Sequence, residues 1–280
     1  MISRLISAGA RAALVLLLVL TPSLILPGQG KDVADALLVV AAFLSILTFI
    51  EYATEFPSLV EFRDAPPFNR LRFLTLFMTV LLLSVVARAE FDPTLMVRVV
   101  RAVGLVVGYA MDFPYSPVRL VVLVLPESSE PGHVIMVRSM AGLAYLTSLV
   151  MLAVFVIVIR LQNWPENNGP FNLWVNLPTF DPTSGGDIVD HLNRDARLNI
   201  IAGFVLPFVL PGIARLGANQ LEPGALLSPQ AMVWTLTLWA FLPASLFMRG
   251  IALGRIADTI AEERKAEEAR RTRLIGVRHA

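Results

Sequence analysis

The sequence predicts an all-α, polytopic membrane protein, and three observations support this class: composition, the length of its apolar runs, and the placement of its charges. Of the 280 residues, 56% are hydrophobic and 16% are charged, whereas a soluble domain is about 25% charged. The mean hydropathy of +0.68 is too high for a soluble globule of this length. Lipid is therefore expected to be one of the solvents of the folded chain.

The apolar runs give the number of crossings. A hydrocarbon core of about 30 Å needs roughly 20 apolar helical residues, with a range of about 17 to 25. We expect six membrane-spanning helices, which lie within residues 12–28, 36–50, 71–87, 140–159, 198–214 and 230–248.

The first run also has the form of a signal peptide, because Arg4 and Arg11 precede a leucine-rich stretch. Pro22 and Pro27 lie inside this run, and the small-x-small pair that cleavage requires abuts the next apolar segment. These features favour a first membrane span over a cleaved leader.

The segment 95–111 is the ambiguous one. It is apolar enough to cross, but Arg98 and Arg101 lie near one end, so we expect an interfacial helix. The alternative is that 95–111 crosses and that 198–214 is broken or re-entrant. Pro207 and Pro211 lie one helical turn apart in that second segment, and each removes a backbone donor.

Basic residues predict the orientation, since cytoplasmic loops carry an excess of lysine and arginine. The chain after residue 248 is rich in arginine, and Arg4 and Arg11 lie at the other terminus. We expect a bacterial-type cell inner membrane with both termini cytoplasmic, a single membrane domain over 1–248 and a charged helical tail over 249–280. One segment breaks this rule, because the expected external region holds Arg88, Arg98, Arg101, Arg119 and Arg138.

Two connecting regions have distinct patterns. Residues 118–125 and 133–137 are rich in β-branched side chains and flank a Pro-Gly pair, which predicts a small hairpin or a surface loop. Residues 162–197 hold several aromatic rings that we expect at headgroup level, followed by a short amphipathic helix. The sequence leaves open on which side of the membrane this second loop lies. Its rings are Trp164, Phe171, Trp174 and Phe180.

Residue types exclude most catalytic chemistry. The chain has no cysteine, which removes disulfides, thiolate catalysis and iron–sulfur clusters. Its three histidines, His133, His191 and His279, lie outside the expected spans, so a membrane haem is not expected. No phosphate loop, nucleophile elbow or metalloprotease motif occurs. We therefore expect no enzyme and no cofactor.

Two polar clusters have simple explanations. The first spans the acidic loop, and its spacing fails the pattern of a calcium loop, so helix capping explains it better than a metal. The second leaves the second span and is interpreted as an anchoring loop at the membrane boundary, where ionisable residues cost little. The two clusters are Asp181, Asp187, Asp190, His191 and Asp195, and Glu51, Tyr52, Glu55, Glu61, Arg63 and Asp64.

By elimination, the sequence favours an accessory, assembly or scaffold protein in the bilayer that binds a membrane-protein partner or a second copy. The net charge of +1 gives no field that would recruit nucleic acid. Small-x-x-x-small pairs predict close helix packing at Gly104 with Gly108 and at Gly250 with Gly254. The alternative is a channel or carrier for a small neutral or amphipathic solute, with Pro207 and Pro211 near its path.

Overall fold

The computed structural model describes residues 2–28, 30–165, 172–178, 180, 187–217, 226 and 228–278, and within them it contains helices and no strand. Six of the helices are long and apolar enough to cross a membrane: α1, α2, α3, α6, α8 and α9. The protein is a polytopic helical membrane protein. The helices are α1 (Ile2–Ile25), α2 (Lys31–Ala53), α3 (Phe68–Arg88), α4 (Leu95–Met111), α5 (Pro117–Val122), α6 (Pro131–Leu161), α7 (Leu173–Asn176), α8 (Ile188–Gly217) and α9 (Pro229–Arg278).

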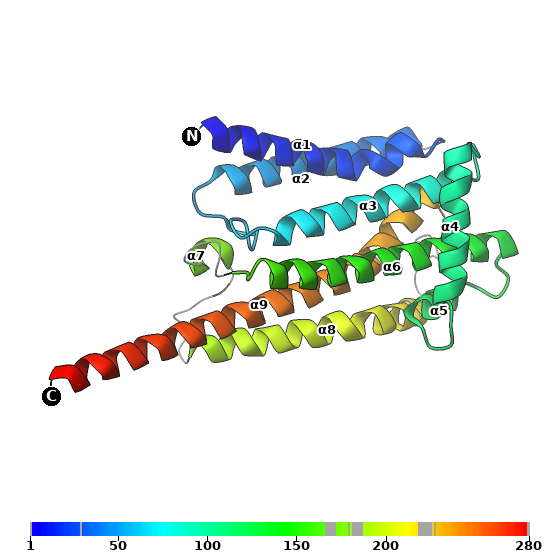
Figure 1. Ribbon diagram of the computed structural model, residues 1–280. Helices are drawn as coiled ribbons and strands as arrows, with labels where there is room; N and C mark the ends of the chain where they lie inside the picture. The colour runs from blue at the N-terminus through cyan, green and yellow to red at the C-terminus, as the bar shows by residue number, and fades with distance from the viewer. Residues whose placement is uncertain are drawn as a thin grey trace.

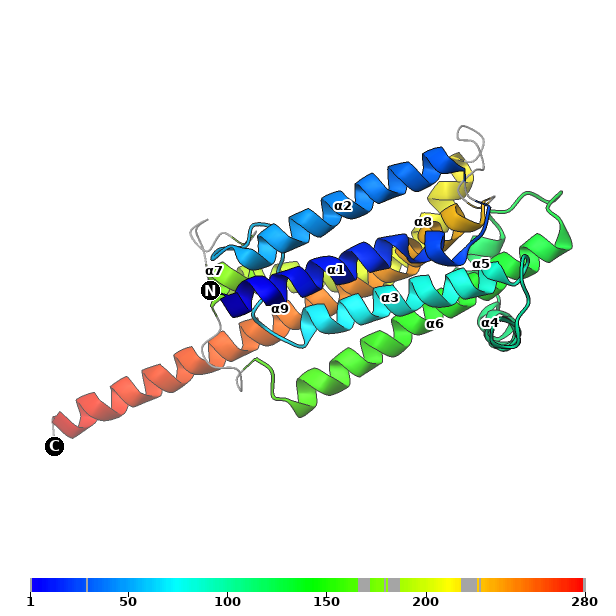
Figure 2. The ribbon, with the colours of Figure 1, turned by 90° about the horizontal axis from the view of Figure 1, so that it is seen from above.

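The six long helices lie side by side, and both chain ends are found at the same end of the bundle (Figures 1 and 2). We call this the terminal end. The short helix α7 lies there too, which puts the described part of the second loop on the same side as the termini. At the opposite end, α4 runs across the bundle, as expected of an interfacial helix. Its bounds coincide with the predicted segment 95–111.

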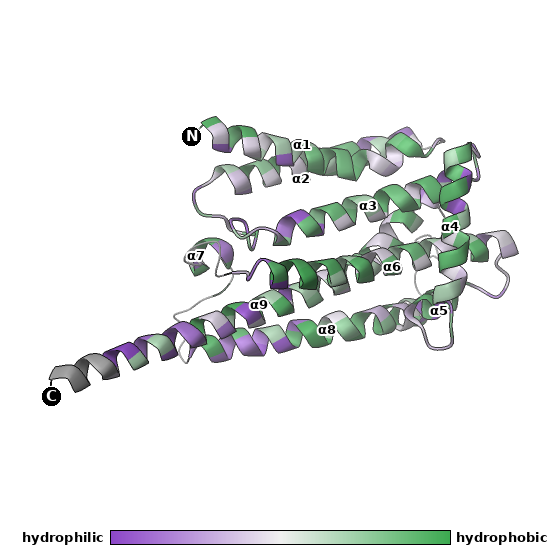
Figure 3. Ribbon diagram, in the orientation of Figure 1, coloured by the Kyte–Doolittle hydropathy of each residue, from purple (hydrophilic) through white to green (hydrophobic). Residues whose placement is uncertain are grey.

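The distribution of hydrophobic and hydrophilic residues agrees with this arrangement. The long helices are mostly hydrophobic within the bundle, whereas hydrophilic residues mark the start of α8 and the outer part of α9 (Figure 3). The last helix continues well past the bundle, as the sequence predicted. Its outer part from Glu262 to Thr272 is exposed, and Arg271 pairs with Glu267 one turn before it at 2.8 Å.

The hairpin expected around residues 118–137 is wrong. Residues 117–122 form α5, where the Ser116 hydroxyl accepts the Arg119 N–H at 3.0 Å and Pro117 takes the first helical position. Pro131 likewise opens α6. A capping serine followed by proline is a strong helix start, and here it outweighs the β-propensity of the valines.

The helix α8 is continuous through both of its prolines, so residues 198–214 are not re-entrant. Because Pro211 has no N–H, the carbonyl of Pro207 loses its normal helical donor. The indole Nε1 of Trp239 on α9 donates to that oxygen at 3.1 Å instead. The neighbouring helix thus satisfies a backbone group that the bilayer cannot.

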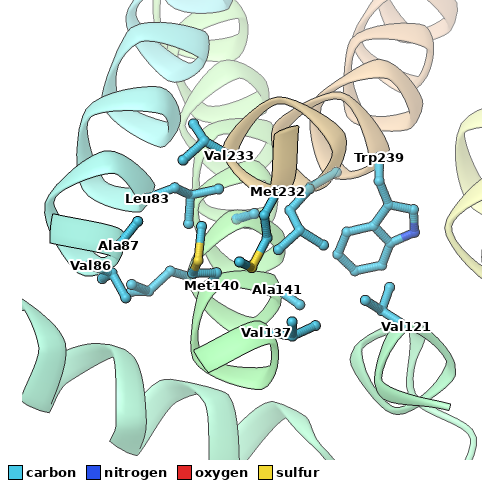
Figure 4. Packing of buried hydrophobic residues seen from close by; sticks show 14 of the residues in the cluster. Leu83, Val86, Ala87, Val121, Val137, Met140, Ala141, Met232, Val233 and Trp239 are labelled. Carbon is cyan, nitrogen blue, oxygen red and sulfur yellow. The ribbon is translucent and has the colours of Figure 1, made fainter. Parts of the chain in front are cut away.

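Two clusters of buried side chains hold α3, α6, α8 and α9 together. The cluster toward the opposite end joins α3, α5, α6 and α9 and includes Leu83, Met140, Met232 and Trp239 (Figure 4). The cluster at the terminal end is centred on Phe62, Phe68, Phe155 and Trp164 and includes residues of α8 and α9. Trp164 is 1% exposed, so protein and not lipid headgroups covers its ring. Phe171 lies outside the described residues.

The hairpin of α1 and α2 is attached more loosely. Only 6% of the most apolar window of α2 is buried, compared with 56% for α9. Its small core consists of Leu18, Val19 and Ala41, against which side chains of α3 pack. The α1–α2 hairpin therefore lies beside the four-helix body without merging into it, which leaves space at the join.

The glycine pairs lie at helix contacts within the chain. A Cβ on Gly108 of α4 would lie 2.8 Å from the Cα of Ser139 on α6, and one on Gly250 of α9 would lie 2.7 Å from the carbonyl oxygen of Ala196 on α8. Gly104 also faces α6, whereas a Cβ on Gly254 would meet Ala196 at an ordinary 3.9 Å. Close backbone approach thus holds α4 across the bundle and α9 against α8.

The arginines that broke the orientation rule are mostly paired. Arg88 donates to the Ile25 carbonyl at 3.0 Å and to Asp92 at 3.1 Å, and Arg98 donates to the Pro93 carbonyl at 2.8 Å. Arg119 and Arg138 both contact the carboxylate of Asp112, at 3.3 and 2.8 Å. Much of the positive charge at this end is therefore locally neutralised or hydrogen-bonded.

Replacing Gly108 with alanine is expected to lower the free energy of unfolding by roughly 1–3 kcal/mol, because the new methyl meets backbone atoms that move only if α4 shifts. Gly9→Ala is the matched control, since Gly9 is helical and nothing lies within 4 Å of its added Cβ. Its stability should be unchanged or slightly higher. Thermal unfolding in detergent measures both, and equal melting temperatures would contradict the close approach of α4 to α6.

Candidate functional site: an arginine-lined cavity at the terminal end

The loop between α2 and α3 is shaped by a buried carboxylate. Glu51, in the last turn of α2, is 4% exposed. Its side chain accepts the backbone N–H groups of Ser58, Leu59 and Val60 at 3.0, 2.9 and 3.1 Å, together with the hydroxyl of Ser58. These hydrogen bonds take the place of the water that would otherwise solvate the carboxylate and the three amide groups.

Arg63 stabilises the same loop from the other side. Its guanidinium donates to the carbonyls of Glu51, Thr54 and Glu55 at 3.1, 2.9 and 2.9 Å, and it pairs with Asp64. These carbonyls lie at the end of α2, where four oxygens lack helical partners. Arg63 thus acts as a C-terminal cap supplied by the following loop.

The loop is also joined to distant parts of the chain. Asn176 of α7 accepts the Phe62 N–H at its carbonyl, at 2.7 Å, and the Asp64 N–H at its side-chain oxygen, at 3.0 Å. Glu61 accepts two hydrogen bonds from Arg249 of α9, at 2.6 and 2.8 Å. The loop is therefore a fixed wall that joins α2, α3, α7 and α9.

Three adjoining cavities lie between this wall, the α1–α2 hairpin and the four-helix body. Their volumes are about 400, 440 and 560 Å³, and Tyr52 lines all three. The first lies among α1, α2 and α3; the second extends along α3 to α9; the third opens outward at Arg4, Glu55 and Asn172. We call them together the arginine-lined cavity.

The lining of the cavity combines polar and apolar groups. Polar and charged side chains, among them Arg11, Tyr52 and Asn69, line its outer part. Apolar side chains of α1, α3 and α9, among them Val15, Leu76, Phe241 and Leu246, line the second cavity beside Arg72 and Arg249. Such a site fits a molecule with one polar end and one apolar end.

Positive charge exceeds negative charge in the lining. Six arginines and three carboxylates line the cavity. The carboxylate of Glu61 pairs with Arg249 and that of Asp64 with Arg63. The arginines are Arg4, Arg11, Arg63, Arg70, Arg72 and Arg249, and the carboxylates are Glu55, Glu61 and Asp64.

Three of these arginines have no carboxylate partner among the described ion pairs. Arg11 donates to the carbonyl of Ser7 at 3.1 Å, and its guanidinium lies over the Tyr52 ring at 4.5 Å. The guanidinium of Arg72 lies over the Phe68 ring at 5.3 Å. The Nε of Arg72 is buried and has no hydrogen-bond partner in the described part of the chain. Arg70 is exposed at the edge of the first cavity.

The sites expected from the sequence lie elsewhere. Neither Pro207 nor Pro211 lines the arginine-lined cavity. In the acidic loop, Asp187 accepts a hydrogen bond from Arg264 at 2.7 Å. That bond, followed by the Val189 N–H, lowers the pKa of the Asp187 carboxyl. The described residues contain no cluster of three or more histidines and carboxylates that would hold a metal, and Asp181 and His279 lie outside them.

Sequence reasoning missed the cavity and the role of Glu51. The acidic and basic residues around the loop were visible, but an anchoring loop explained them equally well. The distinguishing contact is that of Glu61 with Arg249, which lie 188 residues apart. No local pattern predicts such a pair.

Glu51→Ala is expected to loosen the loop, because it removes the common acceptor of the Ser58, Leu59 and Val60 N–H groups, and each such hydrogen bond contributes roughly 0.5–1.5 kcal/mol. Hydrogen exchange of residues 55–64 should accelerate markedly. Glu55→Ala is the control: it removes an exposed carboxylate one turn further along and leaves the carbonyl that Arg63 uses. Unchanged protection in Glu51→Ala would show that the carboxylate does not organise the loop.

No protein-family model, no curated protein and no solved structure matches this chain. Its function must therefore be argued from the geometry of the arginine-lined cavity.

Proposed function

We propose that this chain is a non-catalytic integral membrane protein that binds an amphipathic molecule in the arginine-lined cavity, as a carrier or holder of that molecule. The observation that supports it is that adjoining cavities, which share Tyr52, are lined both by arginines and by apolar side chains of α1, α3 and α9. The loose attachment of α2 gives the ligand a lateral way in from the lipid.

We further propose a bacterial-type inner membrane with the terminal end in the cytoplasm. Arginines concentrate in the tail of α9 and near the start of α1, as the charge rule for cytoplasmic segments requires. The arginines at the opposite end weigh less against this orientation, because most of them are hydrogen-bonded or paired. The cavity then faces the cytoplasmic leaflet.

A second candidate is an accessory, assembly or scaffold protein, favoured by the tail of α9. This segment projects beyond the bundle (Figure 1), and its side chains of both signs are exposed from Glu262 to Thr272. Arg264 anchors its base to Asp187. A charged helix of this kind supports contact with a cytoplasmic partner, which would accompany or replace ligand binding.

Filling the cavity should abolish ligand binding. Val15 lines both the first and the second cavity, so Val15→Trp is expected to displace the amphipathic molecule. Val39→Trp is the control, because Val39 is 69% exposed on the lipid side of α2. Native mass spectrometry after mild detergent extraction measures retained amphiphile. Equal retention in both variants would argue against the cavity as the binding site.

Removing residues 262–280 tests the accessory role. If the tail binds a partner, the full-length protein should be extracted with a companion in fixed stoichiometry. The shortened chain should lose that companion while keeping its bound amphiphile. Chemical cross-linking before gentle extraction, followed by mass spectrometry, gives the measurement. If the same companion stays with the shortened chain, the tail is not the contact.

A further inference from the structure

We propose that α4 is an in-plane lipid anchor, whose outer face is covered by acyl chains of the leaflet at the opposite end of the bundle. This surface lies far from the arginine-lined cavity, so the inference stands apart from the proposed function. Three observations support it: the apolar outer face of α4, the charged edge beside that face, and the level at which α4 crosses α6.

The face of α4 that points away from the bundle is apolar along the helix. Gly104 and Gly108 face α6, whereas Leu95 and Val106, on the other side of the helix, are 75% and 70% exposed. The exposed apolar side chains of α4 are Leu95, Met96, Val99, Val103, Val106 and Tyr109. A continuous apolar face of this kind is unusual on a surface that meets water.

The charge of α4 is confined to one edge of the helix. Arg98 and Arg101 are the only charged residues between 95 and 111, they lie three residues apart on that edge, and both are exposed. Arg101 lines a small crevice with Glu90, which follows the end of α3. Since α3 runs from the terminal end to the opposite end (Figure 1), the charged edge points away from the bilayer centre. This is the arrangement of an amphipathic helix that lies flat in a membrane surface.

The contact with α6 gives the level of α4 in the membrane. A Cβ on Gly142 of α6 would lie 2.7 Å from the Cα of Gly108, and the apolar run of α6 begins just before this contact, at Met140. The start of α6 extends past the contact and carries His133 and Arg138. α4 therefore lies where the polar start of α6 gives way to its apolar part, at the boundary of the hydrocarbon core.

α4 lies against the side of the bundle and does not cover its end. Both ribbon views show it beside α6, running across the other helices, with the start of α6 projecting past it (Figures 1 and 2). The face opposite to the α6 contact is therefore directed sideways, into the membrane that surrounds the bundle. At the boundary of the hydrocarbon core, that face meets acyl chains.

Lipid fits this face better than a protein partner does. The glycine pair of α4, the feature that brings helices together in a bilayer, already packs against α6. The exposed face has no polar side chain besides Tyr109, whereas protein interfaces have a polar rim and regular hydrogen bonds. Tyr109 itself lies under the Arg138 guanidinium at 4.8 Å, and tyrosine is common at the membrane–water boundary.

The chain has no cysteine, so single nitroxide labels test this surface without background. Val99→Cys and Val106→Cys are labelled separately in protein reconstituted into phosphatidylcholine vesicles. Electron paramagnetic resonance then measures collisions with oxygen, which dissolves among acyl chains, and with a polar nickel complex, which stays in water. The ratio of oxygen to nickel accessibility at both positions is expected to exceed that at Glu267→Cys by about tenfold or more, because hydrocarbon excludes polar solutes.

Two labelled positions serve as references. Glu267 is exposed on the outer part of α9 and reports water, and Val39→Cys on the exposed face of α2 reports lipid. Arg98→Cys tests the charged edge of α4 and should be reached by the nickel complex several times more readily than Val106→Cys. Equal nickel accessibility at Arg98 and Val106 would contradict a helix that lies flat with its charged edge toward water.

The other occupants of the outer face give different signals, and each would overturn the lipid anchor. High nickel accessibility at Val99 and Val106 would place the face in water. Low accessibility to both reagents, with an immobile label, would place it against protein, and spin–spin broadening that disappears on dilution with unlabelled chain would identify that protein as a second copy. Melting temperatures equal to that of the unlabelled chain show that the labels leave the fold intact.

Discussion

Glu51 and Arg63 bond to the backbone in opposite senses, and the terminal half of the molecule depends on this exchange. The carboxylate collects amide N–H groups from the loop that follows α2, while the guanidinium collects carbonyls from the end of α2 itself. A charged pair brought this close to lipid would be costly if the two charges only faced each other. Bonded to backbone, each charge satisfies groups that would otherwise be stranded near the membrane.

The opposite end solves a related problem with a different device. There, the carboxylate of Asp112, directly after α4, is contacted by two guanidinium groups, Arg119 of α5 and Arg138 of α6. The Arg138 guanidinium also lies over the Tyr109 ring at 4.8 Å. Together with the glycine contact between α4 and α6, this arrangement ties the interfacial helix to the bundle. At each end of the molecule, buried or half-buried charged side chains thus hold the loops in place.

The sequence predicted what depends on local pattern and missed what depends on distant pairing. The six spans follow from the length of apolar runs. The bounds of 95–111 were predicted from its apolar pattern, but its place across the bundle was only one of two alternatives, favoured because Arg98 and Arg101 lie near one end. Two local signals competed at residues 117–122, where valine content favoured strand and a capped proline favoured helix. The burial of Trp164 was not predicted, because the residues that cover its ring, such as Phe62, are distant in the sequence.

The candidate site could not be predicted from local sequence patterns, for the same reason. Its walls come from α1, α2, α3 and α9, and its shape depends on how far the α1–α2 hairpin stands from the other helices. Hydropathy reports that α2 is apolar, but it does not report whether lipid or protein covers it. The two prolines of α8 suggested a break in that helix. In the structure the helix continues, and Trp239 donates a hydrogen bond to the carbonyl that Pro211 leaves without a helical donor.

The helix α9 is both a wall of the cavity, at Arg249, and a long outward arm. Its 50 residues correspond to a length of about 75 Å, more than twice the thickness of the hydrocarbon core. Beyond Arg249 the helix stays packed against α8 as far as Arg264, where the ion pair with Asp187 anchors it. The part beyond Arg264 accounts for roughly 20 Å of the length. A tilt of a few degrees at that anchor moves the far end by only about 1–2 Å, so the arm holds its exposed charges at a nearly fixed distance from the bundle.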